Sequence, residues 1–215
     1  MIYAERLHAF RDALSKAGLD GFIINRVDMY QGEEVRPADE RLAWLTGFTG
    51  SAGTAVIISD RAAVFSDSRY HVQMERELDS NYFESQDSLA CPPHQWIKSV
   101  AENCNTPLRV GVFGWTTTKT GFDKLVSAFE GTDISFVICN TNFVDALWTD
   151  RPESAPSVPF FLSDEISGRS SRDKCKELAL YLESKQADYL LLTAPDSVNW
   201  LLNLRARDLA CTPIL

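Results

Sequence analysis

The chain has 215 residues, 45% of them hydrophobic and 24% charged, which is typical of a folded globular protein and excludes a wholly disordered one. A formal net charge of -9 without a basic cluster argues against a nucleic-acid partner, because phosphate binding depends on grouped Lys and Arg. No apolar run approaches the roughly 18 to 20 residues that span a membrane, so no membrane partner is expected.

The N-terminus and the cysteines predict a cytoplasmic protein. Glu5, Arg6 and His8 stand where a signal peptide would need an unbroken apolar core. The five cysteines are scattered and odd in number, which favours free thiols in a reducing compartment over a disulfide framework.

Helix and strand patterns alternate from the start of the chain. Apolar residues at helical spacing predict a helix over residues 4–17, and Gly18 is expected to end it. Residues 21–25 (GFIIN) have the composition of a buried strand. The polar stretch 26–40, which contains Pro37, predicts a long loop.

Two β-rich runs follow, residues 54–59 and 62–66, and the two residues that join them predict a hairpin. Asp67 or Ser68 is expected to cap a helix that continues to about Leu78. The next predicted elements are a helix over 94–102, a strand over 109–113, a helix from Thr117 or Thr118 to Phe129, and a strand over 134–139. This order predicts an α/β fold with a mixed sheet flanked by helices.

A proline-rich segment divides the chain. Residues 151–159 hold three prolines in nine residues, which is unfavourable for a helix or a central strand. We therefore predict a first α/β domain over 1–150, a linker over 151–163, and the truncated start of a second α/β domain of the same type over 164–215. In that second region, Ser170 or Ser171 is expected to cap a helix with Leu178 and Leu182 on one face. A strand is predicted over 189–193.

The second region repeats the pattern of the first. Asp188 aligns with Asp20 at an offset of 188 minus 20, or 168, and Trp200 aligns with Trp44 at 200 minus 44, or 156. The difference of 12 residues is placed in the loop 26–40, where insertions are tolerated best. Chance similarity between two short units is the alternative. If the repeat is real, the second sheet is incomplete and the chain is part of a longer one.

No residue pattern supports a catalytic or metal site. Cys91 and His94 have the spacing of zinc ligands, but no second pair would complete a tetrahedral site. The sequence contains no HExxH motif, and the segment 50–53 (GSAG) lacks the spacing of a serine nucleophile elbow. The one glycine-rich loop, 47–53, lacks the Gly-Lys-Ser/Thr end of a phosphate loop, so it is interpreted as a structural bend.

The segment with Asp67 and Arg69, and three of the tryptophans, are interpreted as structural features. Asp67 and Arg69 are expected to mark a helix start, with an anion contact by Arg69 as the alternative. Trp96, Trp115 and Trp148 are expected in a core or a domain interface rather than as ligand platforms.

Four segments in order resemble the aminopeptidase P branch of the pita-bread (creatinase/prolidase-like) metallopeptidases. Residues 41–56 (RLAWLTGFTGSAGTAV) are similar to its glycine-rich signature, and residues 65–70 (FSDSRY) to its Trp-Thr-Asp-Gly-Arg-Tyr segment, with Ser68 in place of the usual Gly. Residues 147–152 (LWTDRP) resemble the end of its first domain, and residues 196–205 (DSVNWLLNLR) a run in its second.

The resemblance implies a three-domain enzyme whose first two domains share one α/β fold. Its third domain would hold two manganese or zinc ions through two Asp, one His and two Glu, and would remove an N-terminal residue that precedes proline. None of those ligands has a counterpart here, so we predict no catalytic and no metal-binding residue in this chain, and no activity of the chain alone. The implied partners are peptides with proline at the second position and a second copy in a homodimer.

In this family the front domain borders the active-site cleft, often that of a partner subunit. The resemblance therefore places Arg41 and the glycines Gly47, Gly50 and Gly53 nearest the substrate. A structural arginine paired with a nearby carboxylate is the alternative. Two other functions remain open: a stand-alone, non-catalytic peptide- or protein-binding relative, and a nucleotide-binding α/β domain, which the missing phosphate loop disfavours.

Overall fold

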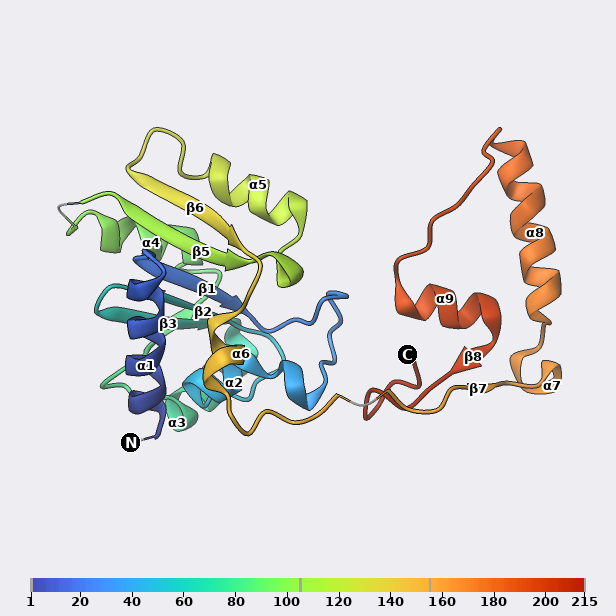
Figure 1. Cartoon of the computed structure of the whole chain (residues 1–215), viewed down its shortest axis with the longest axis horizontal. Coiled ribbons are helices and arrows are strands. Elements are labelled where there is room, and N and C mark those ends of the chain that lie inside the picture. Colours follow the sequence, from blue (N-terminus) through green and yellow to red (C-terminus); the bar gives the residue numbers. More distant parts are fainter. Residues whose placement is uncertain (1, 105, 155, 215) are drawn as a thin grey trace. The chain divides into compact units, whose positions relative to one another are not determined.

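The computed structural model describes residues 2–104, 106–154 and 156–214, so residue 155 of the predicted linker and residue 215 lie outside it. The chain forms two compact units, one ending at Pro152 and the other beginning at Glu153, and each is described by itself (Figure 1).

The first unit contains a six-stranded mixed sheet. Its strands are β1 (Gly21–Asn25), β2 (Thr54–Ile58), β3 (Arg61–Ser66), β4 (Glu84–Asp87), β5 (Leu108–Phe113) and β6 (Ile134–Cys139). The strand order is β4-β3-β2-β1-β5-β6, in which β2 runs antiparallel to β1 and β3 while the remaining pairs are parallel. The predicted hairpin and the predicted mixed sheet are both confirmed.

Helices cover both faces of this sheet (Figure 1). One face carries α1 (Ile2–Lys16), α2 (Arg41–Thr46), α3 (His71–Glu77) and α6 (Phe143–Leu147), and the other carries α4 (Pro93–Ala101) and α5 (Lys119–Ser127). Short 3-10 turns, η1 (Pro37–Asp39), η2 (Ser68–Tyr70) and η3 (Gly114–Thr116), connect these elements.

Alternation along the central strand produces two cores. Phe22 and Ile24 of β1 pack with α1 and α2, whereas Ile23 points to the other face and packs with α4. Because successive side chains of a strand point to opposite faces, a strand buried on both sides is apolar throughout. Residues 21–24 (GFII) fit this description, and the strand ends at the partly buried Asn25.

Helix ends in the first unit follow the expected cap chemistry. The Asp67 side chain accepts a hydrogen bond from the backbone N–H of Arg69 at the start of η2, and α3 continues directly from that turn. The Thr118 hydroxyl accepts from Gly121 at the start of α5. Both caps satisfy backbone donors that the helix itself leaves free.

The second unit contains β7 (Phe160–Phe161), α7 (Asp164–Ser167), α8 (Ser171–Ser184), α9 (Pro195–Leu202) and β8 (Leu204–Arg205). β7 lies inside the segment predicted as a linker and pairs with β8 in an antiparallel ladder. Ser170 caps α8 as expected, by accepting a hydrogen bond from the backbone N–H of Asp173.

The strand predicted over 189–193 is wrong for the structure as described. These residues form neither helix nor strand, and Tyr189 and Leu191 are 92% and 85% exposed. A strand is defined by its hydrogen bonds to a neighbouring strand, and the described residues supply no neighbour for this segment.

None of the helices in the described ranges has the length and apolarity required to traverse a lipid bilayer.

Candidate functional site

Arg41, the first residue of α2, is held by two carboxylates. Its Nε and Nη2 donate to the two oxygens of Asp145 at 2.7 and 3.1 Å, and its Nη1 donates to Asp39 at 2.9 Å. Only 7% of the Arg41 side chain is exposed. Bidentate pairing is the strong mode of arginine–carboxylate contact, so the guanidinium fastens α2 to α6.

A second arginine extends this network. Arg151 Nη1 lies 3.2 Å from Asp145, and its Nε donates to the carbonyl oxygen of Ala38 at 2.7 Å. The alternative interpretation of Arg41, a structural arginine paired with a carboxylate, therefore has a physical basis. Its nearness to a substrate stays a prediction.

The loop after α2 depends on glycine at two positions. Gly47 ends the helix with a φ of 86°, a left-handed conformation that residues with a Cβ rarely adopt. At Gly50 a Cβ would lie 2.2 Å from the Phe48 ring and 2.7 Å from the Tyr70 ring. Gly53 completes the loop, and its carbonyl oxygen accepts from the backbone N–H of Arg26 at 3.0 Å.

Side chains of α3 fasten the first half of this loop. The backbone N–H and the hydroxyl of Thr49 each donate to the Glu77 carboxylate at 2.8 Å, and Gln73 donates to it at 3.0 Å. Burial raises the pKa of Glu77, but the hydrogen bonds from Thr49 and Gln73 outweigh it, so this pKa lies below its ordinary value. The loop is therefore tied to an ionised carboxylate.

Three other contacts fasten the second half. The Ser51 hydroxyl lies 2.5 Å from the Tyr70 hydroxyl, and the Ser66 hydroxyl donates to the carbonyl oxygen of Ala52 at 2.5 Å. Arg26 donates to the carbonyl oxygen of Ser51 at 2.9 Å. The loop is thus a rigid edge with exposed Thr49 and Ser51, whereas the Arg41 guanidinium is directed at α6.

The Asp67–Arg69 pair stands beside this edge. Two hydrogen bonds of 2.8 Å join the Arg69 guanidinium to the Asp67 carboxylate, and the Arg69 side chain is 68% exposed. The hydrogen bond from the Arg69 side chain lowers the pKa of Asp67 to about 2. The geometry supports the helix-start interpretation and leaves the anion contact a prediction.

The tryptophans fall into different environments. Trp96 is 2% exposed, and its Nε1 donates to Glu84 at 2.9 Å. Trp148 stacks on Trp44 with ring centroids 5.8 Å apart. Trp115, in contrast, is 60% exposed, so it is not part of the core of its own unit.

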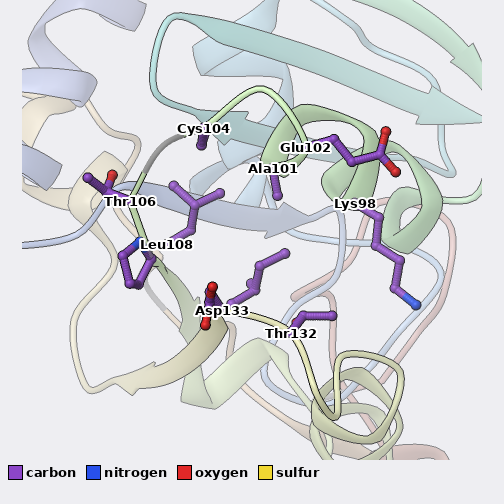
Figure 2. A pocket seen from close by; sticks show the side chains of 10 residues that line it. Lys98, Ala101, Glu102, Cys104, Thr106, Leu108, Thr132 and Asp133 are labelled. Atoms are coloured by element: carbon purple, nitrogen blue, oxygen red, sulfur yellow. The ribbon is translucent and has the colours of Figure 1, made fainter.

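A pocket with no signal in the sequence lies near the ends of the central strands that are opposite to the glycine loop. Figure 2 shows the side chains that line it. The glycine loop leads into Thr54, which pairs with Asn25 at the end of β1, whereas the pocket includes Leu108 at the start of β5, parallel to β1. Its volume is about 340 Å³. It is lined by Lys98, Ala101, Glu102, Cys104, Thr106, Pro107, Leu108, Thr132, Asp133 and Ile134. Side chains of both charge signs line it. Its residues come from the end of α4, the starts of β5 and β6 and the loops that precede these strands, without a common motif.

Within the described ranges, no three His, Cys, Asp or Glu side chains group closely enough to hold a metal ion. His71 pairs with Asp87 at 2.9 Å, and His8 lies 3.8 Å from Asp12. The Asp87 carboxylate also accepts from the backbone N–H groups of Ala90 and Leu89, which lower its pKa. These are local structural pairs.

Both parts of the chain match models of one kind of domain. Residues 6–146 match one model described as the creatinase/prolidase N-terminal domain, and residues 150–215 match another of the same description. The chain belongs to the creatinase/prolidase N-terminal domain family. The predicted resemblance is therefore confirmed.

Curated relatives of this creatinase/prolidase N-terminal family member are much longer than the chain. It is 30% identical over 211 residues to a probable Xaa-Pro aminopeptidase P from Laccaria bicolor, covering 98% of this chain and 33% of that protein. It is 31% identical over 222 residues to Xaa-Pro aminopeptidase 1 from Dictyostelium discoideum, covering 98% and 35%. The chain thus spans about a third of the length of these relatives and corresponds to their N-terminal part.

Solved structures share the family fold. The X-prolyl aminopeptidase from Caenorhabditis elegans, described as a cytosolic enzyme with a di-nuclear active site, superposes with a TM-score of 0.86 at 25% identity, over 100% of this chain and 36% of that one. The N-terminal domain of the peptidase PepQ from Mycobacterium tuberculosis gives a TM-score of 0.51 at 20% identity, over 66% of this chain and 98% of that one. The predicted fold class is confirmed by both.

Proposed function

We propose that this chain is the non-catalytic N-terminal region of a metal-dependent Xaa-Pro aminopeptidase, which removes an N-terminal residue that precedes proline. The observation that carries the proposal is the match of 98% of the chain to the first third of Xaa-Pro aminopeptidases. The substrates would be peptides with proline at the second position. A homodimer and a cytoplasmic location belong to the same proposal, and the cytosolic enzyme from C. elegans supports the location.

The described residues do not fit the two divalent ions that such an enzyme would use. No group of three ligating side chains exists among them. The Asp145 carboxylate, for example, is already neutralised by its ion pairs with Arg41 and Arg151. Manganese or zinc would therefore be held by residues outside this chain, as the di-nuclear site of the C. elegans enzyme suggests.

The role proposed for this region is to shape the active-site cleft or a subunit contact. Support comes from the rigidity of the glycine loop, which is fastened by Glu77, Tyr70 and Arg26 and keeps Thr49 and Ser51 exposed. A preorganised edge can bind an extended substrate without first being ordered. In this proposal Arg41 acts by positioning α2, and the loop from Gly47 to Gly53 faces the substrate.

A stand-alone, non-catalytic peptide-binding protein is the second candidate. The same rigid edge and the absence of a metal-ligand group in the described residues are compatible with it. The two candidates differ in whether the full-length gene product hydrolyses Xaa-Pro peptides.

The test compares the 215-residue chain with the full-length gene product on Xaa-Pro peptides, with and without added Mn²⁺. We expect metal-dependent release of the first amino acid by the full-length protein and none by the 215-residue chain. Hydrolysis by the short chain, or an inert full-length protein that still binds these peptides, would refute the proposal.

A second comparison tests the role of Arg41 in the full-length protein. If Arg41 only positions α2, Arg41→Ala and Asp145→Asn should lower kcat/KM by similar factors, because each breaks the same ion pair. A much larger loss for Arg41→Ala, with kcat/KM falling most for one peptide length, would show direct substrate contact.

A further inference from the structure

The carboxyl end of α4 and the amino ends of β5 and β6 form the pocket shown in Figure 2. Its volume of about 340 Å³ lies at the lower end of the range of about 300 to 1,000 Å³ that ligand pockets occupy. The pocket therefore has the size for a small metabolite. No part of the proposed function uses the residues that line it.

The part of the pocket between the helix and the strands is apolar. Leu108 and Ile134, the first residues of β5 and β6, are partners in the parallel ladder, and Ala101 ends α4. Leu108 is 3% exposed and belongs to the core on this face of the sheet, against which Ala101 and Ile134 pack. These side chains are therefore held in place before a ligand binds, and an apolar ligand group can contact them.

Two carboxylates line the pocket without partners of their own. The side chains of Glu102 and Asp133 are exposed, and neither makes a hydrogen bond or an ion pair within the described part of the chain. In Figure 2, Asp133 lies across the pocket from Ala101 and Cys104. The carboxyl end of α4, which Glu102 follows, adds the partial negative charge of a helix C-terminus. These groups together favour a cationic ligand group such as an ammonium.

A single lysine supplies the opposite charge. Lys98 stands one helical turn before Glu102, and Figure 2 shows its ammonium directed away from that carboxylate. The Lys98 Nζ lies 5.3 Å from the centroid of the Phe129 ring, and among the described residues it has no carboxylate partner. Because the lysine stem is flexible, the ammonium is free to meet an anionic group of a ligand.

A ligand that carries both charges matches this arrangement. An anion without an ammonium would meet two carboxylates, and a dication would also meet the lysine. An α-amino acid has one ammonium and one carboxylate, and an apolar side chain on it would cover Ala101 and Ile134. We propose that this pocket binds a free amino acid with an apolar side chain, whose ammonium faces Asp133 and Glu102 and whose carboxylate faces Lys98. The proposal concerns binding by the first unit and does not rest on the enzymatic activity proposed above.

Titration of the 215-residue chain, followed by NMR chemical shifts, tests the ligand class with L-leucine and three analogues. N-acetyl-leucine lacks the ammonium and should bind at least about tenfold more weakly, because the carboxylates then face an uncharged amide. Glycine lacks the apolar side chain and should also lose at least about tenfold. Leucinamide lacks the carboxylate and should lose about threefold, since solvent screens the exposed lysine. No shift with leucine, or equal affinities for leucine and N-acetyl-leucine, would overturn the proposal.

Alkylation of Cys104 locates the bound ligand. Cys104 lines the pocket and is partly exposed, whereas the exposed Cys175 lies in the second unit. Saturating leucine should slow alkylation of Cys104 by at least about threefold, because a ligand in the pocket covers the thiol, and should leave Cys175 unchanged. The same alkylation rate at Cys104 with and without leucine would place the binding elsewhere and refute the site.

Three substitutions of exposed side chains, which should leave the fold intact, test the assigned charges in the 215-residue chain. Asp133→Asn should weaken leucine binding by at least about fivefold, because a charge-assisted contact is lost. Lys98→Met should abolish the preference for leucine over leucinamide, which a merely structural change would not do. Glu75→Gln removes one negative charge from α3, on the other face of the sheet, and as the matched control should have no effect. Equal effects of Asp133→Asn and Glu75→Gln, or an unchanged preference in Lys98→Met, would contradict the proposal.

Discussion

In the first unit α1 places a cation against a tryptophan of α2, and in the second unit α8 places one against a tryptophan of α9. Arg6 donates to the carbonyl oxygen of Trp44 at 2.7 Å and lies 4.4 Å from a ring centroid of that residue. Lys174 donates to the carbonyl oxygen of Trp200 at 2.7 Å and lies 4.1 Å from its ring. Trp44 is covered by Trp148, whereas Trp200 is 55% exposed.

The difference between the covered Trp44 and the exposed Trp200 separates contacts made within a short stretch of chain from contacts that need distant residues. A helix, its left-handed end and a cation–tryptophan contact form in both units, since the interacting residues need only two helices and a turn. Covering Trp44 needs Trp148, which directly follows α6 and stands 148 minus 44, or 104, positions later in the chain. The described second unit has the contacts between residues close in sequence, and it has no counterpart of the distant tryptophan that covers Trp44.

The largest expected effect compares equivalent core positions. Phe10 of α1 is fully buried and meets Phe22 edge-on at 5.8 Å, whereas Leu178, 168 positions later on α8, is half-buried. We expect Phe10→Ala to lower the free energy of unfolding of the first unit by about 3 to 5 kcal/mol. Leu178→Ala should cost the second unit about 1 kcal/mol, because it leaves a smaller cavity beside solvent.

Urea unfolding followed by exchange of the α1 and α8 peptides would separate these two effects. Similar losses for the two variants would show that the second unit in the 215-residue chain is as well packed as the first, which would break the comparison.

The next effect compares two left-handed glycines that end helices. A Cβ at Gly47 would lie 2.9 Å from the Tyr3 ring, whereas at Gly168, which ends α7 with a φ of 72°, no atom lies within 4 Å. Gly168→Ala should therefore cost about 1 kcal/mol from backbone strain alone, and Gly47→Ala about 2 kcal/mol or more from strain and contact together. Adding Tyr3→Ala to Gly47→Ala should recover the excess if the ring contact causes it. Equal costs for both glycines in thermal unfolding would contradict this account.

A smaller effect concerns the buried lysine. Lys174 is 5% exposed, and its Nζ also donates to the Asn203 side chain at 2.6 Å. Lys174→Met keeps the length of the side chain but leaves two acceptors without a donor, so we expect a loss of about 1 to 2 kcal/mol and faster exchange in α9. Arg6→Met in the first unit is the matched variant. It should cost less, because Trp148 still holds Trp44. A larger loss for Arg6→Met would reverse the comparison.

The sequence predicted the elements whose signals are local or strongly apolar. The helix over 4–17, the hairpin of β2 and β3, and the cap at Thr118 are confirmed within one or two residues. β4 was missed because Glu84–Asp87 is polar and its pairing with β3 is set by tertiary structure. α2 was missed because it has only six residues and no side-chain cap, and six residues are too few to show a helical repeat of apolar positions.

The candidate site shows the same division. The glycine loop could be recognised because its residues are contiguous in sequence. The pairing of Arg41 with Asp145 could not be assigned, since the two residues are separated by 104 positions and no spacing rule connects them. The strand expected over 189–193 is wrong for a related reason. The residue pattern of a segment indicates its strand propensity, but it does not provide the neighbouring strand that the segment would need.

The smallest effect is the pH dependence of two hydrogen-bonded carboxylates, one in each unit. Glu77 has a lowered pKa, because the hydrogen bonds from Thr49 and Gln73 outweigh its burial, and the hydrogen bond with Ser170 lowers the pKa of Asp173. A carboxylate whose pKa is lower in the folded state stabilises the fold above its unfolded pKa, about 4 for both residues, and this stabilisation is lost as the pH falls through the folded pKa.

Glu77→Gln and Asp173→Asn should therefore destabilise the protein at pH 7, and the difference from the unchanged protein should shrink as the pH falls from 5 toward about 3. Exchange measured across this range should show the Glu77 effect in the loop 47–53 and the Asp173 effect at the start of α8. A difference that stays constant with pH would mean that the carboxylates act by shape rather than by charge. Both carboxylates bond residues within 30 positions along the chain, so this contribution is local in the first unit as in the second. It should therefore be present in both units, even though the described residues of the second unit form only the two-stranded sheet of β7 and β8.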